Sequence, residues 1–251
     1  MSAAPGGHEL VPPPAAGRVF EAERRVRLGD ASPAGRLRLD ALARYAQDVA
    51  HDDTLDAGLP DADGWVVRRT ALRVARFPVY DEPLVLRTWC SGVGGRWADR
   101  RTSLAGARGG CIEIATLWVA VDATTGRPRP LGPTFAELYA PSAAGRAVSP
   151  RLWHEPPPAG ADGEPWPLRF TDFDVLGHVN NAAYWEPVEE VLAQRRHLRA
   201  PLRAELEHVR AAEVGAALRL VRADSPDGGA ALWLRGDDGT VHASAVLRMV
   251  P

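Results

Sequence analysis

Lysine is absent from the 251-residue chain, and all thirty basic residues are arginine. This absence excludes Schiff-base and pyridoxal-phosphate chemistry, kinase-type lysines and the lysine of a phosphate-binding loop. Cysteine is scarce as well, because Cys90 and Cys111 are too few for a disulfide scaffold. Such cysteine usage suits a reducing compartment, so we expect a cytoplasmic protein.

The chain also lacks the features of a nucleic-acid or membrane protein. Its formal net charge is −2 and its pI is about 6.4, so the basic excess of a nucleic-acid binder is missing. No apolar run approaches the roughly 18 residues of a membrane span, and the first residues do not resemble a signal peptide. The 45% hydrophobic and 25% charged residues indicate a globular protein.

Two common kinds of catalytic site are missing from the sequence. It contains no HExxH-type pair and no Cys/His quartet, so we expect no metal site, and no organic cofactor is implied. It contains no G-x-S-x-G elbow, which excludes the common serine-hydrolase arrangement.

Two stretches rich in proline, glycine and alanine divide the chain. Residues 1–17 are predicted to be a disordered tail, and residues 140–165 a linker. The blocks that remain are 18–139 and 166–251, and each shows the same order of signals. A glycine turn comes first, then a helical pattern of apolar residues, then several strands. The helical positions are Leu39, Leu42, Ala43, Ala46, Val49 and Ala50 in the first block, and Tyr184, Val188, Val191 and Leu192 in the second.

Placing Gly35 over Gly177 superimposes the two blocks and indicates an internal repeat. The pairs that this places together are Arg27 with Arg169, Asp30 with Asp172, Ser32 with Asp174, and Arg36 with His178. Only the second copy has an acidic residue and an imidazole at the last two positions. The repeat therefore predicts a single active site, in the second block.

The segment from Asp172 to Trp185 holds that acid and base. Asp174 and His178 lie on either side of Gly177 at the expected start of a helix, which the pair Asn180 and Asn181 is suited to cap. Backbone N–H groups near Gly177–Val179 would stabilise an oxyanion while Asp174 or His178 acts on water. The competing interpretation is a capped helix with two solvated polar residues.

This segment resembles the signature of hotdog-fold thioesterases, in the form D-x-D-x-x-G-H-V-N-N-x-x-Y. The duplication resembles the acyl-ACP thioesterases of plant plastids and bacteria, and the likeness covers about residues 18–250. The other stretches that match are Leu39–Ala50, Trp65–Arg69, Thr88–Trp97 and Ala115–Val119. The resemblance implies an α+β fold of two tandem hotdog units, each an antiparallel sheet wrapped around one long helix. It also implies a continuous sheet, with the acyl pocket and active site between the halves.

The resemblance further implies hydrolysis of fatty acyl-ACP, as part of fatty acid biosynthesis. It carries the catalytic aspartate and histidine onto Asp174 and His178, with Gly177, Val179, Asn180 and Asn181 around the thioester. Plant enzymes have an asparagine where this chain has Leu176, and a Glu-Cys pair where it has Ala211 and Ala212. Three alternatives stay open: acyl-CoA as substrate, Asp174 as base or as nucleophile, and a non-catalytic acyl-thioester-binding protein. The expected assembly is a monomer or a homodimer.

Other polar clusters are interpreted as solvated surface. They are Glu186, Glu189 and Glu190 on the second helix, and His51, Asp52 and Asp53 at the end of the first. The same interpretation applies to Arg68-Arg69, Arg100-Arg101 and Arg195-Arg196-Arg199. If acidic acyl carrier protein is the partner, one of these arginine clusters should bind it.

Overall fold

The computed structural model describes residues 10–59, 64–122, 124–225 and 227–250. Half of the tail predicted to be disordered, residues 1–9, therefore lies outside the described residues. Residues 10–17 form no helix or strand, but the backbone of Gly17 packs against Ser142. In the described part of the chain, no helix combines the length and the apolar character that crossing a bilayer takes.

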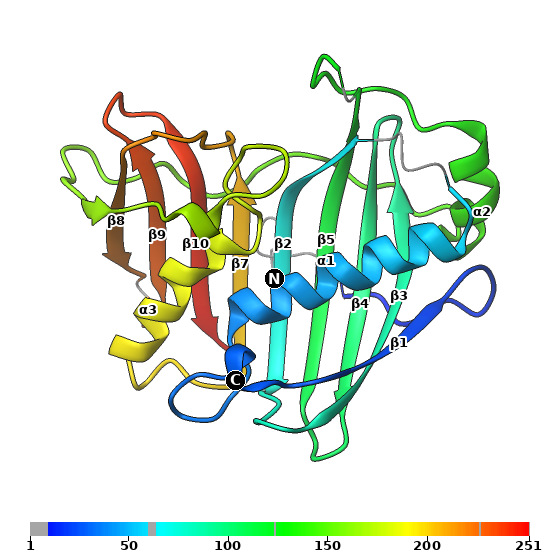
Figure 1. Ribbon diagram of the computed structural model, residues 1–251, viewed down its shortest axis with the longest axis horizontal. Coiled ribbons are helices and arrows are strands. Elements are labelled where there is room, and N and C mark those ends of the chain that lie inside the picture. Colours follow the sequence, from blue (N-terminus) through cyan, green and yellow to red (C-terminus); the bar gives the residue numbers. More distant parts are fainter. Residues whose placement is uncertain (1–9, 60–63, 123, 226, 251) are drawn as a thin grey trace, which may run out of the picture.

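All ten strands of the described chain join one antiparallel sheet (Figure 1). The order across the sheet is β1-β3-β4-β5-β2-β7-β10-β9-β8-β6, and the pairing of β2 with β7 joins the two halves of the chain. The continuous sheet expected from the resemblance is thus confirmed. The strands are β1 (Phe20–Arg25), β2 (Gly64–Arg76), β3 (Pro83–Val93), β4 (Trp97–Gly106), β5 (Cys111–Val121), β6 (Glu164–Trp166), β7 (Leu202–His208), β8 (Leu218–Asp224), β9 (Ala230–Gly236) and β10 (Val241–Met249).

Helix α1 (Leu39–Asp56) lies across one face of the first half of the sheet (Figure 1). Its apolar residues recur every three to four positions, so they form one stripe that is buried against the sheet. The helix ends at Ala57, and Gly58 follows with a φ of +67°, a conformation that glycine adopts without steric cost. The helix predicted from the spacing is confirmed.

The helix of the second half is shorter than the expected long helix. After Asn180 the chain passes through a turn and a 3-10 turn (Ala183–Trp185), and α3 runs only from Glu186 to Gln194. Pro187 stands in the first turn of α3, where a missing N–H costs little, so it marks the break without bending the helix. Val188, Val191 and Leu192 join the same apolar core as α1.

Glu189 connects the two halves on this helical face. Its carboxylate accepts two bonds from the Arg36 guanidinium, at 3.0 and 2.8 Å, and one from the Leu39 N–H at 2.5 Å. The first N–H groups of a helix have no partner within it, so Glu189 caps α1 from the other half. Its side chain is 11% exposed, so the expectation that it lies on a solvated face is wrong.

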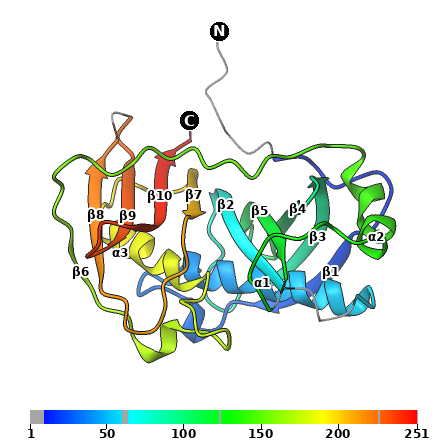
Figure 2. The same ribbon diagram turned by 90° about the horizontal axis from the view of Figure 1, so that it is seen from above.

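The stretch predicted as a linker crosses the face of the sheet opposite α1 and α3 (Figure 2). It begins inside α2 (Pro133–Ala143), which the sequence patterns did not predict. Beyond α2 it is fixed to the sheet by buried side chains. Glu207 accepts the N–H groups of Trp153 and His154 at 2.6 and 3.1 Å, and Trp233 donates to the Glu155 carbonyl at 2.9 Å. The connection is therefore a strap that covers the outer face of the sheet.

Candidate active site

The glycine turn that repeats in the sequence also repeats in structure. In the first copy Ser32 N–H donates to the Arg36 carbonyl and Gly35 N–H to the Ser32 carbonyl. In the second copy Asp174 N–H and Gly177 N–H make the same two bonds, to His178 and Asp174. The φ angles of Gly35 and Gly177 are +78° and +75°. Two turns of identical bonding confirm the alignment at this motif and explain why each copy needs a glycine there.

The side chain of Asp174 is held by two donors in the second turn. Its Oδ1 accepts the Leu176 N–H at 3.0 Å, and its Oδ2 accepts Nδ2 of Asn180 at 3.3 Å. Asn180 Oδ1 in turn accepts the Ala182 N–H at 2.9 Å, but neither the 3-10 turn nor α3 has a side-chain cap, so the expected capping by the asparagine pair is wrong. Asp174 is half-buried and next to Val175 and Leu176, which are fully exposed and 70% exposed. The carboxylate is thus oriented by the protein and still within reach of solvent.

Three of the backbone N–H groups expected near the thioester oxygen already donate within the fold. Gly177 N–H donates to Asp174, Val179 N–H to the Ala212 carbonyl at 2.9 Å, and Asn180 N–H to the Asp172 carbonyl at 2.8 Å. The expectation overlooked these bonds. The side-chain amide of Asn181 has no hydrogen-bond partner among the described residues.

His178 lies on the same turn, and its backbone forms an isolated bridge with Glu213. Its ring is half-buried and makes no hydrogen bond within the described chain. Asp174 and His178 are therefore neighbours on one turn, but the structure shows no direct bond between their side chains. An imidazole in this position is free to contact substrate or water.

Two further side chains lie beside the motif: Tyr184, which the sequence indicated only as a helical position and as the last residue of the motif, and His208, which no sequence pattern indicated. The Tyr184 hydroxyl accepts the Ala212 N–H at 3.1 Å, and its ring meets His208 edge-on with centroids 5.1 Å apart. Burial raises the pKa of Tyr184, and the charge of Asp174 raises it further, so its O–H stays protonated near that carboxylate. Burial lowers the pKa of His208 to about 3, with help from the Arg68 charge. His208 is therefore neutral near pH 7.

A small cavity of about 20 Å³ lies between the helical layer and the sheet, where the two halves meet. It is lined by side chains from both halves: Ala43, Ala46 and Gln47 of α1, Val67, Thr70 and Leu72 of β2, Ile114, Thr116 and Trp118 of β5, and Asn181, Trp185 and His208. Asn181 is the predicted site residue that lines it. Asp174 does not line it, but the preceding residue, Asn180, donates to the Asp174 carboxylate.

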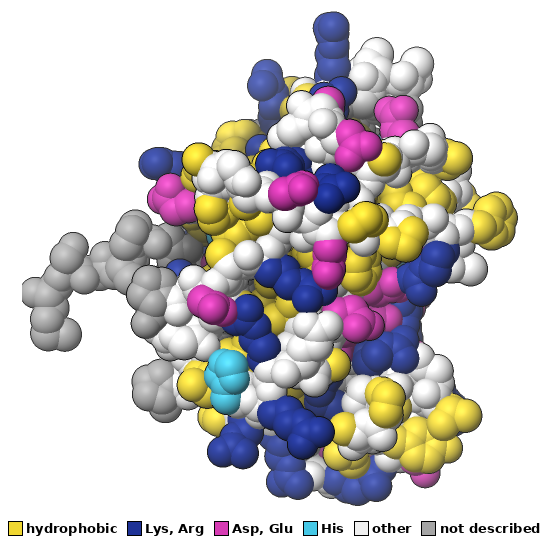
Figure 3. Space-filling view, turned by 90° about the vertical axis from the view of Figure 1, so that its left-hand side faces the viewer, with side chains coloured by type: hydrophobic (Ala, Val, Ile, Leu, Met, Phe, Trp, Pro, Cys, Tyr) yellow, Lys and Arg dark blue, Asp and Glu magenta, His cyan; other side chains and the backbone are white. Residues whose placement is uncertain are grey.

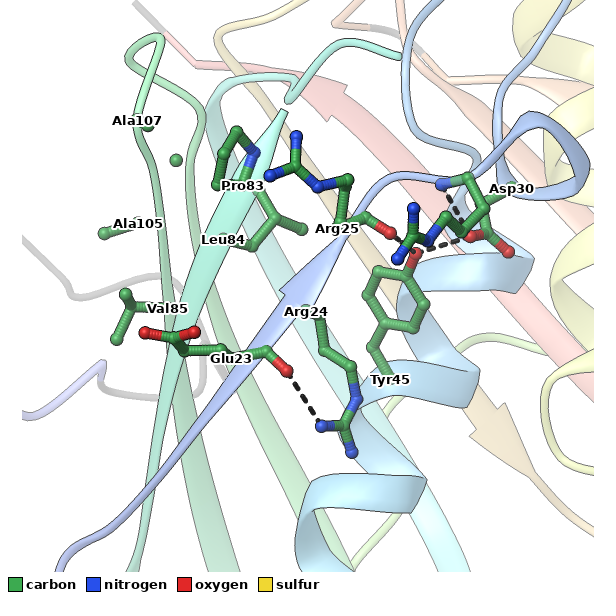
Figure 4. A pocket seen from close by; sticks show the side chains of 12 residues that line it. Glu23, Arg24, Arg25, Asp30, Tyr45, Pro83, Leu84, Val85, Ala105 and Ala107 are labelled. Atoms are coloured by element: carbon green, nitrogen blue, oxygen red, sulfur yellow. Dashed lines mark hydrogen bonds between the residues drawn. The ribbon is translucent and has the colours of Figure 1, made fainter. Parts of the chain in front are cut away.

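A larger cleft, of about 720 Å³, lies in the first half (Figure 4). It opens beside Arg24, Arg25 and Arg27 and extends to Tyr45, whose hydroxyl donates to Asp30 at 2.5 Å. None of the predicted site residues lines it. Size alone therefore does not identify the active site.

Several charged residues expected at the surface are buried. Asp53 accepts Nε of Arg18 and Nη1 of Arg100, both at 2.6 Å, and the Tyr139 hydroxyl at 2.9 Å. Arg69 and Arg101 are only 4% and 0% exposed. The expectation of solvated clusters is wrong here, because tertiary contacts supply partners that neighbours in sequence do not reveal. In the described chain no group of three or more histidine, cysteine, aspartate or glutamate side chains is arranged to hold a metal ion.

Two family models match consecutive parts of this chain. Residues 17–139 match the acyl-ACP thioesterase N-terminal domain, and residues 159–245 match the acyl-ACP thioesterase C-terminal domain. The chain belongs to the acyl-ACP thioesterase family. It is therefore a thioester hydrolase with acyl-ACP as its substrate.

Known proteins agree with the family in sequence and in fold. The uncharacterized protein Rv2001 of Mycobacterium tuberculosis is 32% identical over 240 residues, which cover 95% of each chain. The 12:0-ACP thioesterase from Umbellularia californica matches with a TM-score of 0.75 at 20% identity, over 97% of this chain and 98% of its own. An acyl-ACP thioesterase from Bacteroides thetaiotaomicron matches with a TM-score of 0.70 at 18% identity, over 92% of this chain and 97% of its own. These likenesses show the hotdog-type fold.

This thioesterase departs from the plant pattern at positions next to its motif. Ala212 is fully buried against Val179 and Tyr184, through the backbone bonds described above, and Ala211 is exposed. The segment aligned with the plant Glu-Cys pair is thus beside the motif, but it carries no polar side chain at either position.

Proposed function

We propose that this thioesterase hydrolyses fatty acyl-ACP with Asp174 as its central catalytic group. The observation that carries this proposal is the carboxylate held by Leu176 N–H and Asn180 Nδ2, on a turn that has no acidic counterpart in the first copy. Two donors fix its orientation, and half-burial leaves it accessible to water. Asp174 either removes a proton from water or attacks the thioester carbonyl directly. The bond that breaks in both cases joins the acyl carbon to sulfur.

The remaining site residues assist this step. Asn181 donates its side-chain amide to the oxygen on which negative charge develops. Tyr184 keeps its proton near Asp174, so its hydroxyl is a donor that orients the water. His178 protonates the leaving thiolate or positions the carboxylate. Gly177 and Val179 maintain the turn, and Asn180 positions Asp174.

The acyl chain enters the cavity between α1 and the sheet. Its walls are mostly apolar, as a pocket for a hydrocarbon chain requires. Ligand pockets usually measure several hundred Å³, whereas this cavity measures about 20 Å³, so entry of the chain must displace side chains.

The chain is organised as a tail (1–17), two tandem hotdog units (18–139 and 166–251) and a linker (140–165). One helix on the inner face of each half and the repeated turn support this division. The protein acts in the cytoplasm, in fatty acid biosynthesis, as a monomer or a homodimer. The scarcity of cysteine supports the compartment.

Acyl carrier protein binds near the end of α3. Arg195 is engaged by Asp224 at 2.5 Å, but Arg196 and Arg199 are exposed and make no ion pair within the described chain. Elsewhere on this edge the arginines are interspersed with carboxylates (Figure 3), including Arg222 with Glu164. The unpaired guanidinium groups of Arg196 and Arg199 are therefore available to an acidic partner.

The test compares hydrolysis of acyl-ACP and acyl-CoA of matched chain length by the wild-type protein. We expect a higher kcat/KM for acyl-ACP, with a KM that rises with salt because docking is electrostatic. Faster hydrolysis of acyl-CoA at every chain length would refute the choice of carrier. Absence of turnover on both substrates would refute the proposed catalysis.

A further inference from the structure

Two of the residues that line the cavity between the halves each have a buried nitrogen atom with no hydrogen-bond partner in the described part of the chain. The atoms are Nε1 of Trp118 and Nε2 of His208. Trp118 lies on β5 and His208 on β7, with β2 between them in the sheet, so the two side chains flank one stretch of the cavity. Neither atom takes part in the catalysis proposed above.

Such groups are uncommon in a purely hydrocarbon pocket. A buried polar group without a partner loses its hydration and gains nothing in return, so most buried polar atoms in proteins are bonded. Two of them in one small cavity indicate that a bound ligand supplies the missing partner. If the ligand were a saturated chain, the apolar side chains of Val67, Leu72 and Ile114 would be sufficient to bind it, and no polar group would be needed.

The chemistry of the two nitrogens defines that partner. The indole N–H of Trp118 only donates, so the ligand atom must accept. His208 is neutral because burial keeps its pKa near 3, so its Nε2 donates or accepts according to its tautomer. A hydroxyl group satisfies both, because it accepts from Trp118 and either donates to or accepts from His208.

The position of the cavity indicates which part of the substrate carries the hydroxyl. Asn181 lines the cavity and directly follows Asn180, which holds Asp174. The carbons in the cavity are therefore those next to the thioester. We propose that this thioesterase selects acyl chains that bear a hydroxyl group close to the thioester, such as 3-hydroxyacyl chains, through Trp118 and His208. This inference rests on the proposed function, because it assumes that the acyl chain occupies this cavity.

The experiment measures kcat/KM for three acyl-ACP substrates of one chain length, which are saturated, 3-hydroxy and 3-oxo. We expect wild-type protein to prefer the 3-hydroxy substrate to the saturated one at least about tenfold, the effect of leaving one buried polar group unpaired. Trp118→Phe and His208→Phe should each reduce this ratio to within about threefold. Ile114→Val is the matched control: it enlarges the same cavity without removing a polar atom, so it should leave the ratio unchanged.

Equal or better hydrolysis of the saturated substrate would overturn the inference and leave the proposed function intact. Preference for the 3-oxo substrate would overturn the assignment of a hydroxyl. A second measurement does not need turnover: Kd values for non-hydrolysable thioethers of saturated and 3-hydroxyacyl pantetheine, with wild type and the same variants. If no thioester is hydrolysed, the proposed function fails. The ratio of the Kd values for the saturated and 3-hydroxyacyl thioethers then shows by itself whether the protein prefers a hydroxyl group.

Discussion

Replacement of the buried Asp53 by asparagine should destabilise the protein by about 3 kcal/mol. Removing one partner of a buried ion pair typically costs about 3–5 kcal/mol, because the other charge stays buried without compensation. The side chain of Arg100 is 11% exposed and loses its counter-ion, whereas Arg18 is 22% exposed and keeps Asp56. Most of the lost stability therefore comes from the unpaired charge of Arg100, so we expect a loss at the lower end of that range.

The neighbouring Asp52 provides a matched control on the same helix. Asp52 is 40% exposed and pairs with Arg24, which is 29% exposed, so Asp52→Asn should cost less than about 1 kcal/mol. Thermal unfolding followed by circular dichroism should show a Tm about 6–12 °C lower for Asp53→Asn, at about 2–4 °C per kcal/mol for a chain of this size. Equal shifts for the two variants, or a loss below about 1 kcal/mol at Asp53, would refute the reasoning.

Three further predictions concern the carrier, the architecture and pH. Arg196→Glu combined with Arg199→Glu should raise KM for acyl-ACP and spare acyl-CoA; equal effects on both substrates in steady-state assays would place docking elsewhere. Residues 166–251 alone should aggregate or dimerise, because β7 loses its pairing with β2 and presents an open edge; a well-behaved monomer in analytical ultracentrifugation would contradict this. The folded pKa of His208 lies below its unfolded value, so the unfolded chain binds a proton first and stability falls as pH drops below about 6.5. Between pH 6.5 and 5.5, the free energy of unfolding measured with denaturant should fall by up to about 1 kcal/mol more in the wild type than in His208→Phe. An equal pH dependence of stability in both proteins would contradict the assignment.

The sequence predicted a helix or strand correctly where the spacing of its own apolar residues defines its buried face. The spacing of Leu39, Leu42 and Val49 predicted α1. Strand β4 was not predicted, because its buried residues include Asp99 and Arg101, whose partners come from other parts of the chain. Charged residues of this kind look solvated until the fold supplies their partners.

In the site, too, features that depend on nearby residues were predicted, whereas features that depend on tertiary contacts were not. The glycine turn that carries Asp174 was predicted, because it depends on residues a few positions apart. His208 was not, because the sheet brings β7 beside Tyr184 only after folding. Likewise, the repeat did not reveal that the N–H groups of Gly177 and Val179 are consumed by backbone bonds.

The most direct test of the account is the turnover of Asp174→Asn on acyl-ACP. The variant keeps the size of the side chain and an oxygen that accepts the Leu176 N–H. Its new amide NH₂ group, however, faces the Nδ2 donor of Asn180, which binds the carboxylate in the wild type. Its Tm must therefore be measured beside its activity, with Asp174→Ala as a second variant. We predict that kcat falls at least about 100-fold in both while the protein stays folded, and that His178→Ala costs less. Turnover near the wild-type level in a folded Asp174→Asn protein would contradict the assignment of Asp174 as the catalytic group.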